Sequence, residues 1–237
     1  MLSVPPPFIA QDTATMTVTE IGCMGVKPGL DIMDPSKPEG RILPEAWRTV
    51  TTKPGGPSRV CWGLEHEDPS RVWAFFDWES VEQHHNFIKT HAPDAVKDIP
   101  KICTASECVK HAALEPSTDA LTAPWVEVTL AYFPKDIAEA DKEVALTQVY
   151  KVLAASGVEN RALGWGLEND YPVRGGDGQT GAALVGVVGW PSREEQARFR
   201  GTDGYNESVE LLKRTPGLVG SINVSIEGKH MEREVEK

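Results

Sequence analysis

The sequence lacks long basic clusters and long apolar runs, and each absence removes a class of function. Its 237 residues carry 35 acidic against 24 basic side chains, for a net charge of −11. A chain this acidic repels a phosphate backbone, so we expect no nucleic-acid partner. No apolar run approaches the ~18 residues that suggest a membrane span, so we expect no membrane-embedded part.

Cysteine is scarce, and its spacing predicts no metal site. The four cysteines, Cys23, Cys61, Cys103 and Cys108, form no CxxC pair of the zinc-binding type. The segment Met1 to Thr13 is rich in proline and lacks the basic and apolar regions of a signal peptide. We therefore expect a cytoplasmic protein whose cysteines are free thiols in a reducing compartment.

Two short blocks occur twice and indicate an internal duplication. The block Trp62-Gly63-Leu64-Glu65 returns as Trp165-Gly166-Leu167-Glu168, and the spacing of Trp78, Ser80, Glu82 and Phe87 returns at Trp190, Ser192, Glu194 and Phe199. The second copy is longer between its blocks, within 171–180. Such a repeat predicts two similar units, which we place at residues 1–115 and 116–237.

Both units show the same order of elements. Hydrophobic alternation predicts strands at 15–26, 59–67, 71–78 and 108–114, and again at 125–133, 161–169, 182–190 and 218–226. Helices are expected at 43–51, 80–90, 142–155 and 205–214, with capping boxes at Ser80 and Ser192. Each unit is thus a ferredoxin-like β-α-β-β-α-β unit. The predicted fold class is α+β, with tandem units that form a pseudo-dimeric α+β barrel and a pocket between their sheets.

The segment from Trp78 through Ser80, Phe87 and Thr90 to His91 resembles the strand-to-helix segment of the dimeric α+β barrel superfamily, in particular its antibiotic-biosynthesis monooxygenase type. Most members carry one unit per chain and dimerise, so this chain resembles such a dimer fused in tandem. The resemblance implies chemistry on polycyclic phenols or polyketides in an apolar cavity, in some members with O2 and no cofactor.

Haem-degrading members of that superfamily differ from this chain at two places. They carry a Trp at the position of Phe87 and a haem-ligating His at the position of Lys97. The second copy has Phe199 and Val209 at these places. The departure argues against haem.

Three histidines, His84, His85 and His91, form the densest imidazole cluster. An imidazole that faces a cavity can act as a general base for a phenol, because its pKa lies near neutrality. We take His91 and His85 as candidate catalytic bases. The alternative is a partly solvated helix flank with His91 at its end. His84 and His85 point ~100° apart on a helix, which makes them poor metal ligands.

Glu65 and Glu168 hold the same place in the repeated block, so the pseudo-twofold axis would relate them. If they face inward, one carboxyl could have a raised pKa and act as an acid. Alternatively, they are edge-strand glutamates in solvent. On the last strand Asn223 belongs to a polar stripe with Ser221 and Ser225, which we expect to line the cavity and to orient a substrate carbonyl.

Candidate substrate-binding residues are mostly aromatic: Trp73, Trp62, Trp165, Phe87 and His66. The recurrence of Trp62 as Trp165 favours packing between sheet and helices, whereas Trp73 has no aromatic counterpart and is the better candidate for a pocket wall.

The segment Gly176-Asp177-Gly178-Gln179-Thr180-Gly181 matches the GxGxxG pattern of dinucleotide-binding loops. That pattern binds pyrophosphate only between a strand and a helix, and here it lies between two predicted strands. We predict a hairpin insert that covers the mouth of the barrel.

The leading hypothesis is a cofactor-independent monooxygenase that acts on an aromatic or polyketide-like small molecule in a biosynthetic pathway, with O2 as co-substrate. One alternative is a cofactor-free polyketide cyclase, dehydratase or isomerase in the same pocket. Another is a non-catalytic protein that binds an apolar metabolite. We expect no metal and no cofactor, and either a monomeric pseudo-dimer or a homodimer.

Overall fold

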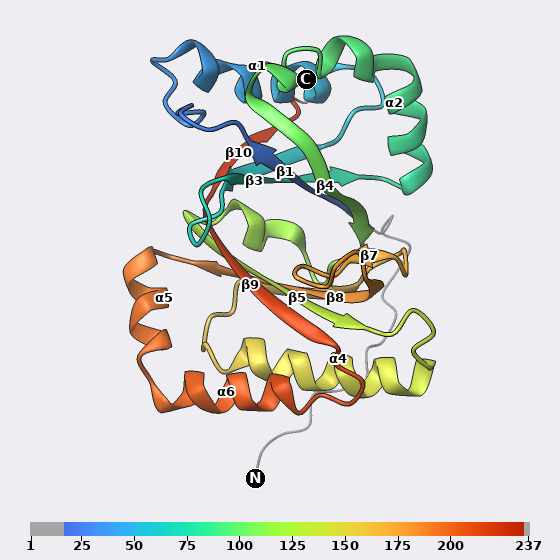
Figure 1. The fold of residues 1–237 in the computed structure, drawn as a ribbon, viewed down its shortest axis with the longest axis vertical. Coiled ribbons are helices and arrows are strands. Elements are labelled where there is room, and N and C mark those ends of the chain that lie inside the picture. Colours follow the sequence, from blue (N-terminus) through green and yellow to red (C-terminus); the bar gives the residue numbers. More distant parts are fainter. Residues whose placement is uncertain (1–16, 235–237) are drawn as a thin grey trace.

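A computed structural model describes residues 17–234 of the chain. Two antiparallel sheets lie face to face, and the helices cover their outer sides (Figure 1). The first half contains β1 (Val18–Val26), α1 (Pro38–Thr52), β2 (Arg59–Leu64), β3 (Arg71–Trp78), α2 (Val81–Ala95), α3 (Ile99–Ile102) and β4 (Cys103–Ala112). A 3₁₀ turn, η1 (Thr118–Thr122), leads to the second half, which contains β5 (Trp125–Phe133), α4 (Glu139–Ala154), β6 (Arg161–Trp165), β7 (Tyr171–Pro172), β8 (Thr180–Trp190), α5 (Arg193–Arg200), α6 (Asp203–Lys213), β9 (Gly220–Glu227) and β10 (Lys229–Glu232).

The strand order confirms the predicted fold class. The first sheet has the order β10-β2-β3-β1-β4, and the second has β6-β8-β5-β9, with β7 paired to β8. Without β10 and β7, both orders are that of a ferredoxin-like split unit. The protein is therefore a tandem pair of such units, which form one pseudo-dimeric α+β barrel.

The chain at the end of each unit pairs with an edge strand of the other unit. Beyond β4, the chain bridges to β6 through the pairs Ala112↔Gly166 and Glu115↔Leu163. Beyond β9, β10 pairs with β2 over its whole length, from Lys229↔Trp62 to Glu232↔Arg59. The barrel closes at these two seams. The sequence did not predict β10, and the division of the chain at 115/116 stays a prediction.

Side chains fill the space between the two sheets. A core cluster there includes Ile21, Trp73, Phe75, Leu130 and Val185, all at most 2% exposed. Two further clusters fill the layers between each sheet and its helices. Strand β5 is buried at every residue, because its alternate residues pack into two different layers. The pocket that the sequence placed between the sheets is therefore a packed core, and that expectation was wrong.

Several elements differ from their predicted bounds. Helix α2 continues past Thr90 to Ala95, β2 ends at Leu64, and β4 begins at Cys103. The predicted linker 115–124 packs against the barrel, because the Thr118 hydroxyl donates a buried hydrogen bond to Asp77 (2.7 Å). No helix within residues 17–234 combines the length and the apolar character that crossing a membrane requires.

Strand register shows that the repeated Trp-Gly-Leu-Glu blocks are not structurally equivalent. Trp62 pairs with Ala74, whereas Leu163 pairs with Gly186, the residue that corresponds to Ala74. The structural counterpart of Trp62 is thus Leu163, two residues before Trp165. By the same register, Glu168 corresponds to Glu67 and not to Glu65. The expected twofold relation between Glu65 and Glu168 was therefore wrong.

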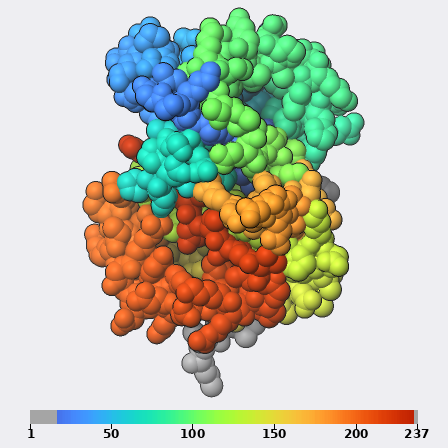
Figure 2. Space-filling view, viewed as in Figure 1, coloured from blue at the N-terminus to red at the C-terminus, as the bar shows by residue number. Residues whose placement is uncertain are grey.

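The insert at 171–180 is a hairpin, as predicted. Tyr171 pairs with Gly181, and the Val173 amide donates to the Gln179 carbonyl (2.9 Å). Two projections cover the junction between the halves in Figure 2: this loop, in orange, and the turn that joins β2 to β3, in cyan. The loop lies over a closed core rather than over an open mouth.

Two equivalent glycines mark the closest backbone approach at the seams. A Cβ atom at Gly164 would overlap the carbonyl oxygen of Ala113, and a Cβ atom at Gly63 would lie 2.5 Å from the carbonyl oxygen of Glu227. We expect Gly164→Ala and Gly63→Ala each to lower the free energy of unfolding by about 2 kcal/mol or more, because backbone must move to accept the methyl group. Urea denaturation measures this change.

Gly204→Ala is the control, because its Cβ atom would have only the Thr202 hydroxyl nearby, at 3.8 Å. We expect it to leave stability unchanged or slightly higher. Equal losses for all three variants would contradict the assignment of the two seam contacts.

Candidate active site

A chain of four titratable side chains runs from beneath α2 to the surface. His84 Nε2 lies 3.2 Å from Glu20 Oε2, and His84 Nδ1 lies 2.8 Å from His111 Nε2. His111 Nδ1 lies 2.6 Å from Glu168 Oε1. Glu20 is on β1, His84 on α2 and His111 on β4, and Glu168 follows β6 of the other unit. We call these residues the four-residue chain.

The repeated tryptophan segment holds the inner end of this chain. The Ser80 hydroxyl accepts a hydrogen bond from the Gln83 amide (3.0 Å) and fixes the first turn of α2. The His84 ring stacks on Trp78 at 4.7 Å, and the Trp78 indole donates to Glu20 (3.0 Å). The predicted cap therefore also places a histidine against a buried carboxyl.

The second unit holds the outer end. Glu168 accepts from the backbone N–H of His111 (2.8 Å) as well as from its ring. The Leu167 amide and the Tyr171 hydroxyl both donate to the His111 carbonyl (2.8 and 2.5 Å). His111 is thus fixed at the seam by residues of the other half of the chain.

Burial and hydrogen bonding shift three of the four pKa values. Burial raises the pKa of Glu20 to about 7, although the Trp78 hydrogen bond and the nearby His111 oppose it. Burial and the neighbouring imidazoles lower the pKa of His84 to about 4. Burial would raise the pKa of Glu168, but the two hydrogen bonds from His111 outweigh it and hold that pKa below its ordinary value. At neutral pH, His84 is uncharged and Glu168 is ionised.

The geometry fixes the number of protons in the chain. Each of its three short contacts needs one proton between two heavy atoms, so the four side chains share three protons. One distribution that satisfies all three contacts has a single proton on each imidazole and the third on Glu20, in keeping with the raised pKa of Glu20 and the lowered pKa of Glu168. We accordingly assign His84 as the donor to His111, and His111 as the donor to Glu168.

Exposed apolar residues occur on the elements that carry the four-residue chain. Ile88, Val109 and Leu167 are 41%, 47% and 49% exposed. Val109 pairs with Gly22, above which a Cβ atom would meet only the Ala74 carbonyl of the same sheet within 4 Å. The Glu168 side chain is itself 30% exposed. We call Gly22, Ile88, Val109 and Leu167 the apolar shelf: Gly22 and Val109 lie two residues along their strands from Glu20 and His111, Ile88 lies one helical turn after His84, and Leu167 precedes Glu168.

The second unit builds the same arrangement without histidine. Glu127 accepts from Trp190 (3.1 Å), as Glu20 accepts from Trp78. At the positions of His84, His111 and Glu168 it has Gln196, Ser225 and Glu67, joined by hydrogen bonds of 3.1 and 2.8 Å.

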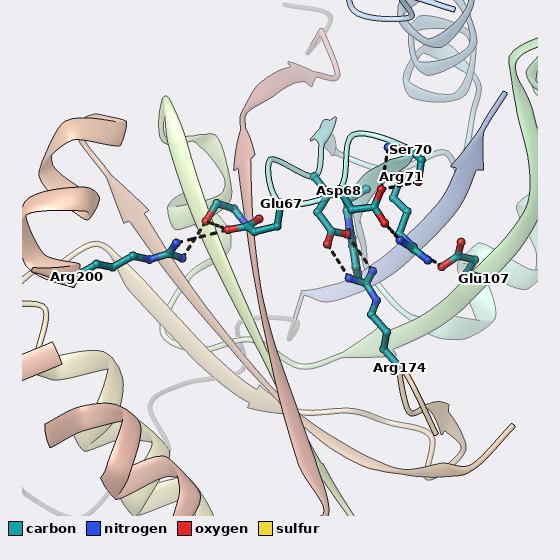
Figure 3. A network of polar contacts seen from close by, with 10 residues as sticks. Glu67, Asp68, Ser70, Arg71, Glu107, Arg174 and Arg200 are labelled. Atoms are coloured by element: carbon teal, nitrogen blue, oxygen red, sulfur yellow. Dashed lines mark hydrogen bonds and ion pairs between the residues drawn. The ribbon is translucent and has the colours of Figure 1, made fainter. Parts of the chain in front are cut away.

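A fixed cation completes this second arrangement. Arg200 donates to Glu127 (2.8 Å) and lies 3.5 Å from Glu67, the contact that Figure 3 draws from α5 toward the turn after β2. The guanidinium pairs with both carboxylates, so this seam has a fixed cation in addition to its hydrogen bonds.

Glu65 faces inward, as one reading of the sequence expected, but it is paired with a cation. Arg174 of the 171–180 insert donates to both of its oxygens (2.7 and 3.0 Å), and Trp73 donates at 2.9 Å. The Arg174 guanidinium also lies 5.4 Å from the Trp73 ring. Figure 3 shows Arg174 reaching from the insert toward the β2–β3 turn. In this arrangement Glu65 and Trp73 anchor the insert.

The other candidate catalytic residues lie apart. His85 is exposed, with its ring 6.0 Å from that of His111, and His91 is half-buried, 5.0 Å from Phe87. Asn223 is exposed and accepts from Thr129 (2.8 Å). Its neighbours Ile222 and Val224 are the residues that pack between the sheets. The expectation that Asn223 lines a cavity there was therefore wrong.

The remaining substrate-binding candidates are scattered over three places. Trp62 and Phe87 are buried between the first sheet and its helices, and Trp165 packs against Phe133 (5.2 Å). His66 lies against Trp125 (5.3 Å) in a seam cleft of about 690 Å³, which is lined by Met33, Leu64, Glu65, His66, Pro69, Pro124, Trp125, Pro191, Ser192, Arg193, Glu227 and Lys229.

Within the described part of the chain, no three His, Cys, Asp or Glu side chains converge in a way that would hold a metal ion. The site residues that the sequence did not reveal are Glu20 and, as a catalytic candidate, His111. A signal for Glu20 was present, because a glutamate two residues into the first strand recurs as Glu127.

The raised pKa of Glu20 predicts a pH-dependent loss of stability. Its folded value of about 7 exceeds the ordinary 4.5, so its contribution is complete below pH 4.5 and is lost as pH rises through 7. This loss is on the order of 3 kcal/mol. We expect Glu20→Gln, which cannot ionise, to lack it. Urea unfolding of both proteins at pH 4.5 and 8 isolates the effect, since titration of His84 is common to the two. Parallel losses in the two proteins would refute it.

No family model matches the chain, and no curated protein matches it. Solved structures do resemble it over nearly its whole length. An anthrone oxidase-like protein superposes with a TM-score of 0.62 at 11% identity, over 92% of this chain and 94% of its own. A candidate monooxygenase from Fusobacterium nucleatum subsp. nucleatum gives 0.57 at 12% identity, over 92% and 95%. A candidate chlorite dismutase gives 0.55 at 10% identity, over 90% and 94%.

At these identities the likeness concerns the fold. The matches span both halves of this chain together, as a tandem arrangement requires. The chain therefore has the fold of the dimeric α+β barrel proteins, with both units of the barrel in one polypeptide.

Proposed function

We propose that the protein is a cofactor-independent monooxygenase that acts on an aromatic or polyketide-like small molecule in a biosynthetic pathway. The observation that carries this proposal is the half-exposed carboxylate of Glu168, held by His111 beside the apolar shelf. Structures similar in fold include an anthrone oxidase-like protein and candidate monooxygenases, which is consistent with this chemistry.

The proposed substrate has an acidic hydrogen and a delocalised anion. Glu168 accepts that proton, and the anion gives one electron to O2. Recombination forms a peroxide, and loss of water then leaves a carbonyl group. At a methylene carbon, the two C–H bonds are thus replaced by one C=O bond. One oxygen atom of O2 stays in the product and the other leaves as water with both hydrogens, so the substrate supplies all the electrons.

The strength of the base limits the substrates that it can deprotonate. The hydrogen bonds from His111 hold the pKa of Glu168 below its ordinary value, which makes it a weak base. A weak base suits a polycyclic phenol or an anthrone, because the anions of such molecules are strongly stabilised by delocalisation.

The sequence-predicted residues take unequal parts in this proposal. We assign Glu168 as the base and His111 as the residue that orients it. His85 lies at the rim of the apolar shelf, where it can bind or protonate a substrate oxygen. We place Glu65, His91, Asn223 and the tryptophans outside the reacting region.

The alternative reaction class is a cofactor-free cyclisation, dehydration or isomerisation at the same carboxylate. It is favoured by the presence of a protonated carboxyl and an ionised one in a single connected chain, because such reactions need both an acid and a base. O2 dependence separates the two classes. A protein that only binds an apolar metabolite would perform neither.

The test is turnover of a small panel of anthrones and polycyclic phenols, followed by an oxygen electrode and by mass spectrometry with isotopically labelled O2. We expect equimolar loss of O2 and substrate, and one labelled oxygen atom in the product. Glu168→Gln should lower kcat by about 100-fold or more while the substrate still binds.

Glu67→Gln is the matched control, because Glu67 is the counterpart of Glu168 at the other seam, and we expect it to keep its activity. Unchanged turnover under nitrogen would assign the alternative class. Full activity of Glu168→Gln would remove Glu168 as the base. Tight binding with no turnover of any probe would indicate a binding protein.

A further inference from the structure

We propose that the four-residue chain is a proton relay, in which Glu20 is an internal acid that returns a proton to the reaction at Glu168. This inference rests on the proposed function for its role in turnover, but the relay itself can be measured without a substrate. The observation that carries it is the unbroken series of short contacts, 3.2, 2.8 and 2.6 Å, between a buried carboxyl and a half-exposed one.

The transfer is balanced at every atom. Glu20 gives its proton to His84 Nε2, His84 gives its Nδ1 proton to His111 Nε2, and His111 gives its Nδ1 proton to Glu168 Oε1. One proton has left Glu20 and one has arrived at Glu168. Each imidazole ends as its other tautomer, and the total charge is unchanged. No oxidant, reductant or outside base takes part.

The second unit shows that packing alone does not need these residues. Its counterpart buries a glutamate under a tryptophan with Gln196 and Ser225, neither of which titrates, and with the fixed charge of Arg200. In the first unit Ile88 occupies the position of Arg200 and is 41% exposed, so Glu20 has no such cation beside it. The same fold is thus stabilised by a permanent charge in one unit and by a movable proton in the other.

The environment directs this proton toward one outlet. Glu20, His84 and His111 are 9%, 4% and 3% exposed, whereas the Glu168 side chain is 30% exposed. Other polar or titratable groups near the chain are Trp78 of β3, His85 of α2, and Tyr171 and Cys108, which both interact with Glu168. The neighbours of His111 and Glu168 in sequence, Lys110 and Asp170, form an ion pair (2.6 Å). The hydrogen-bonded route from Glu20 toward the apolar shelf therefore runs through the two histidines and Glu168.

The proposed reaction uses the proton held on Glu20 at one step. Glu168 first takes a proton from the substrate, and later a peroxide O–O bond breaks and the departing hydroxide needs a proton to leave as water. By then Glu168 has returned the first substrate proton to the peroxide anion, and one of its oxygens takes the second C–H proton. The proton of Glu20, passed through His84 and His111, reaches the other oxygen of Glu168 and goes to the departing hydroxide. After product release the C–H proton on Glu168 returns through the two histidines to Glu20, so the cycle needs no proton from solvent.

Spectroscopy of the free protein tests the relay directly. We expect the infrared spectrum at pH 5.5 to contain the carbonyl band of a protonated, buried carboxyl, which disappears in Glu20→Gln but not in Glu127→Gln. Nitrogen NMR at pH 7 should show neutral His84, with Nδ1 protonated and Nε2 not. An ionised Glu20 at pH 5.5, or a His84 protonated at Nε2 and not at Nδ1, would overturn the relay.

Kinetics test its role in turnover. In the full-length chain, Glu20→Gln and His84→Gln should each lower kcat by about tenfold with KM nearly unchanged. The limb of the kcat pH profile near pH 7 should vanish in Glu20→Gln. His84→Gln reproduces the Gln196 of the other unit and so keeps a hydrogen-bonding side chain in place. Glu127→Gln, and Glu67→Gln if the former folds poorly, should retain the profile of the natural sequence.

The two kinds of failure are distinct. If the natural sequence turns over and Glu20→Gln keeps both its kcat and its pH profile, the relay has no catalytic role while the proposed function stands. If no probe consumes O2, the proposed function fails, and the infrared and NMR results still decide whether the relay exists.

Discussion

Backbone pairing across the two seams is the constraint on which the rest of the structure depends. At one seam the Glu115 and Leu163 backbones exchange hydrogen bonds of 3.2 and 2.9 Å, and at the other the His66 amide donates to the Ser225 carbonyl (2.7 Å). These bonds satisfy strand edges that would otherwise pair with other chains. They also bring residues from opposite halves of the sequence within bonding distance, and every contact between His111 and Glu168 follows from them.

The seams also explain why the functional groups lie outside the barrel core. Because both faces of the central strands are buried, the space between the sheets holds apolar side chains and a single fixed ion pair, Glu65 with Arg174, among the residues that the structure describes. Polar groups with room to react occur where a strand end leaves its sheet, and both carboxylates that cap the seams, Glu67 and Glu168, lie there. The proposed chemistry therefore lies at the junction of the units.

Much of the fold could be predicted from local sequence. Alternating strands such as 125–133, together with the caps at Ser80 and Ser192, define the elements, and the repeat defines the two units. Register could not be predicted, because a shift of two residues leaves every side chain on the same face of a strand. The block around Trp62 therefore matches the block around Trp165 in sequence, but the two blocks occupy different positions in their strands.

The candidate site was predicted only in part. Glu168 was identified as a candidate because it ends the repeated Trp-Gly-Leu-Glu block. His85 was also a candidate, and its ring lies close to that of His111. Glu20, His84 and His111 come from a strand, a helix and another strand, and only the tertiary fold shows that they form a line. Asn223 was misplaced because its strand has polar residues on one face and apolar residues on the other, and sequence alone does not tell which face meets the opposite sheet.

The covalent link between the two units has a consequence for how such a barrel can change. In a symmetric homodimer any substitution appears twice, so replacing the arginine at one seam replaces it at both. A single polypeptide is free of that constraint. Here Arg200 pairs with two carboxylates at one junction, and the equivalent junction carries the proposed acid and base groups. Joining the two units in one chain thus allows the two junctions to carry different residues, which two identical subunits cannot do.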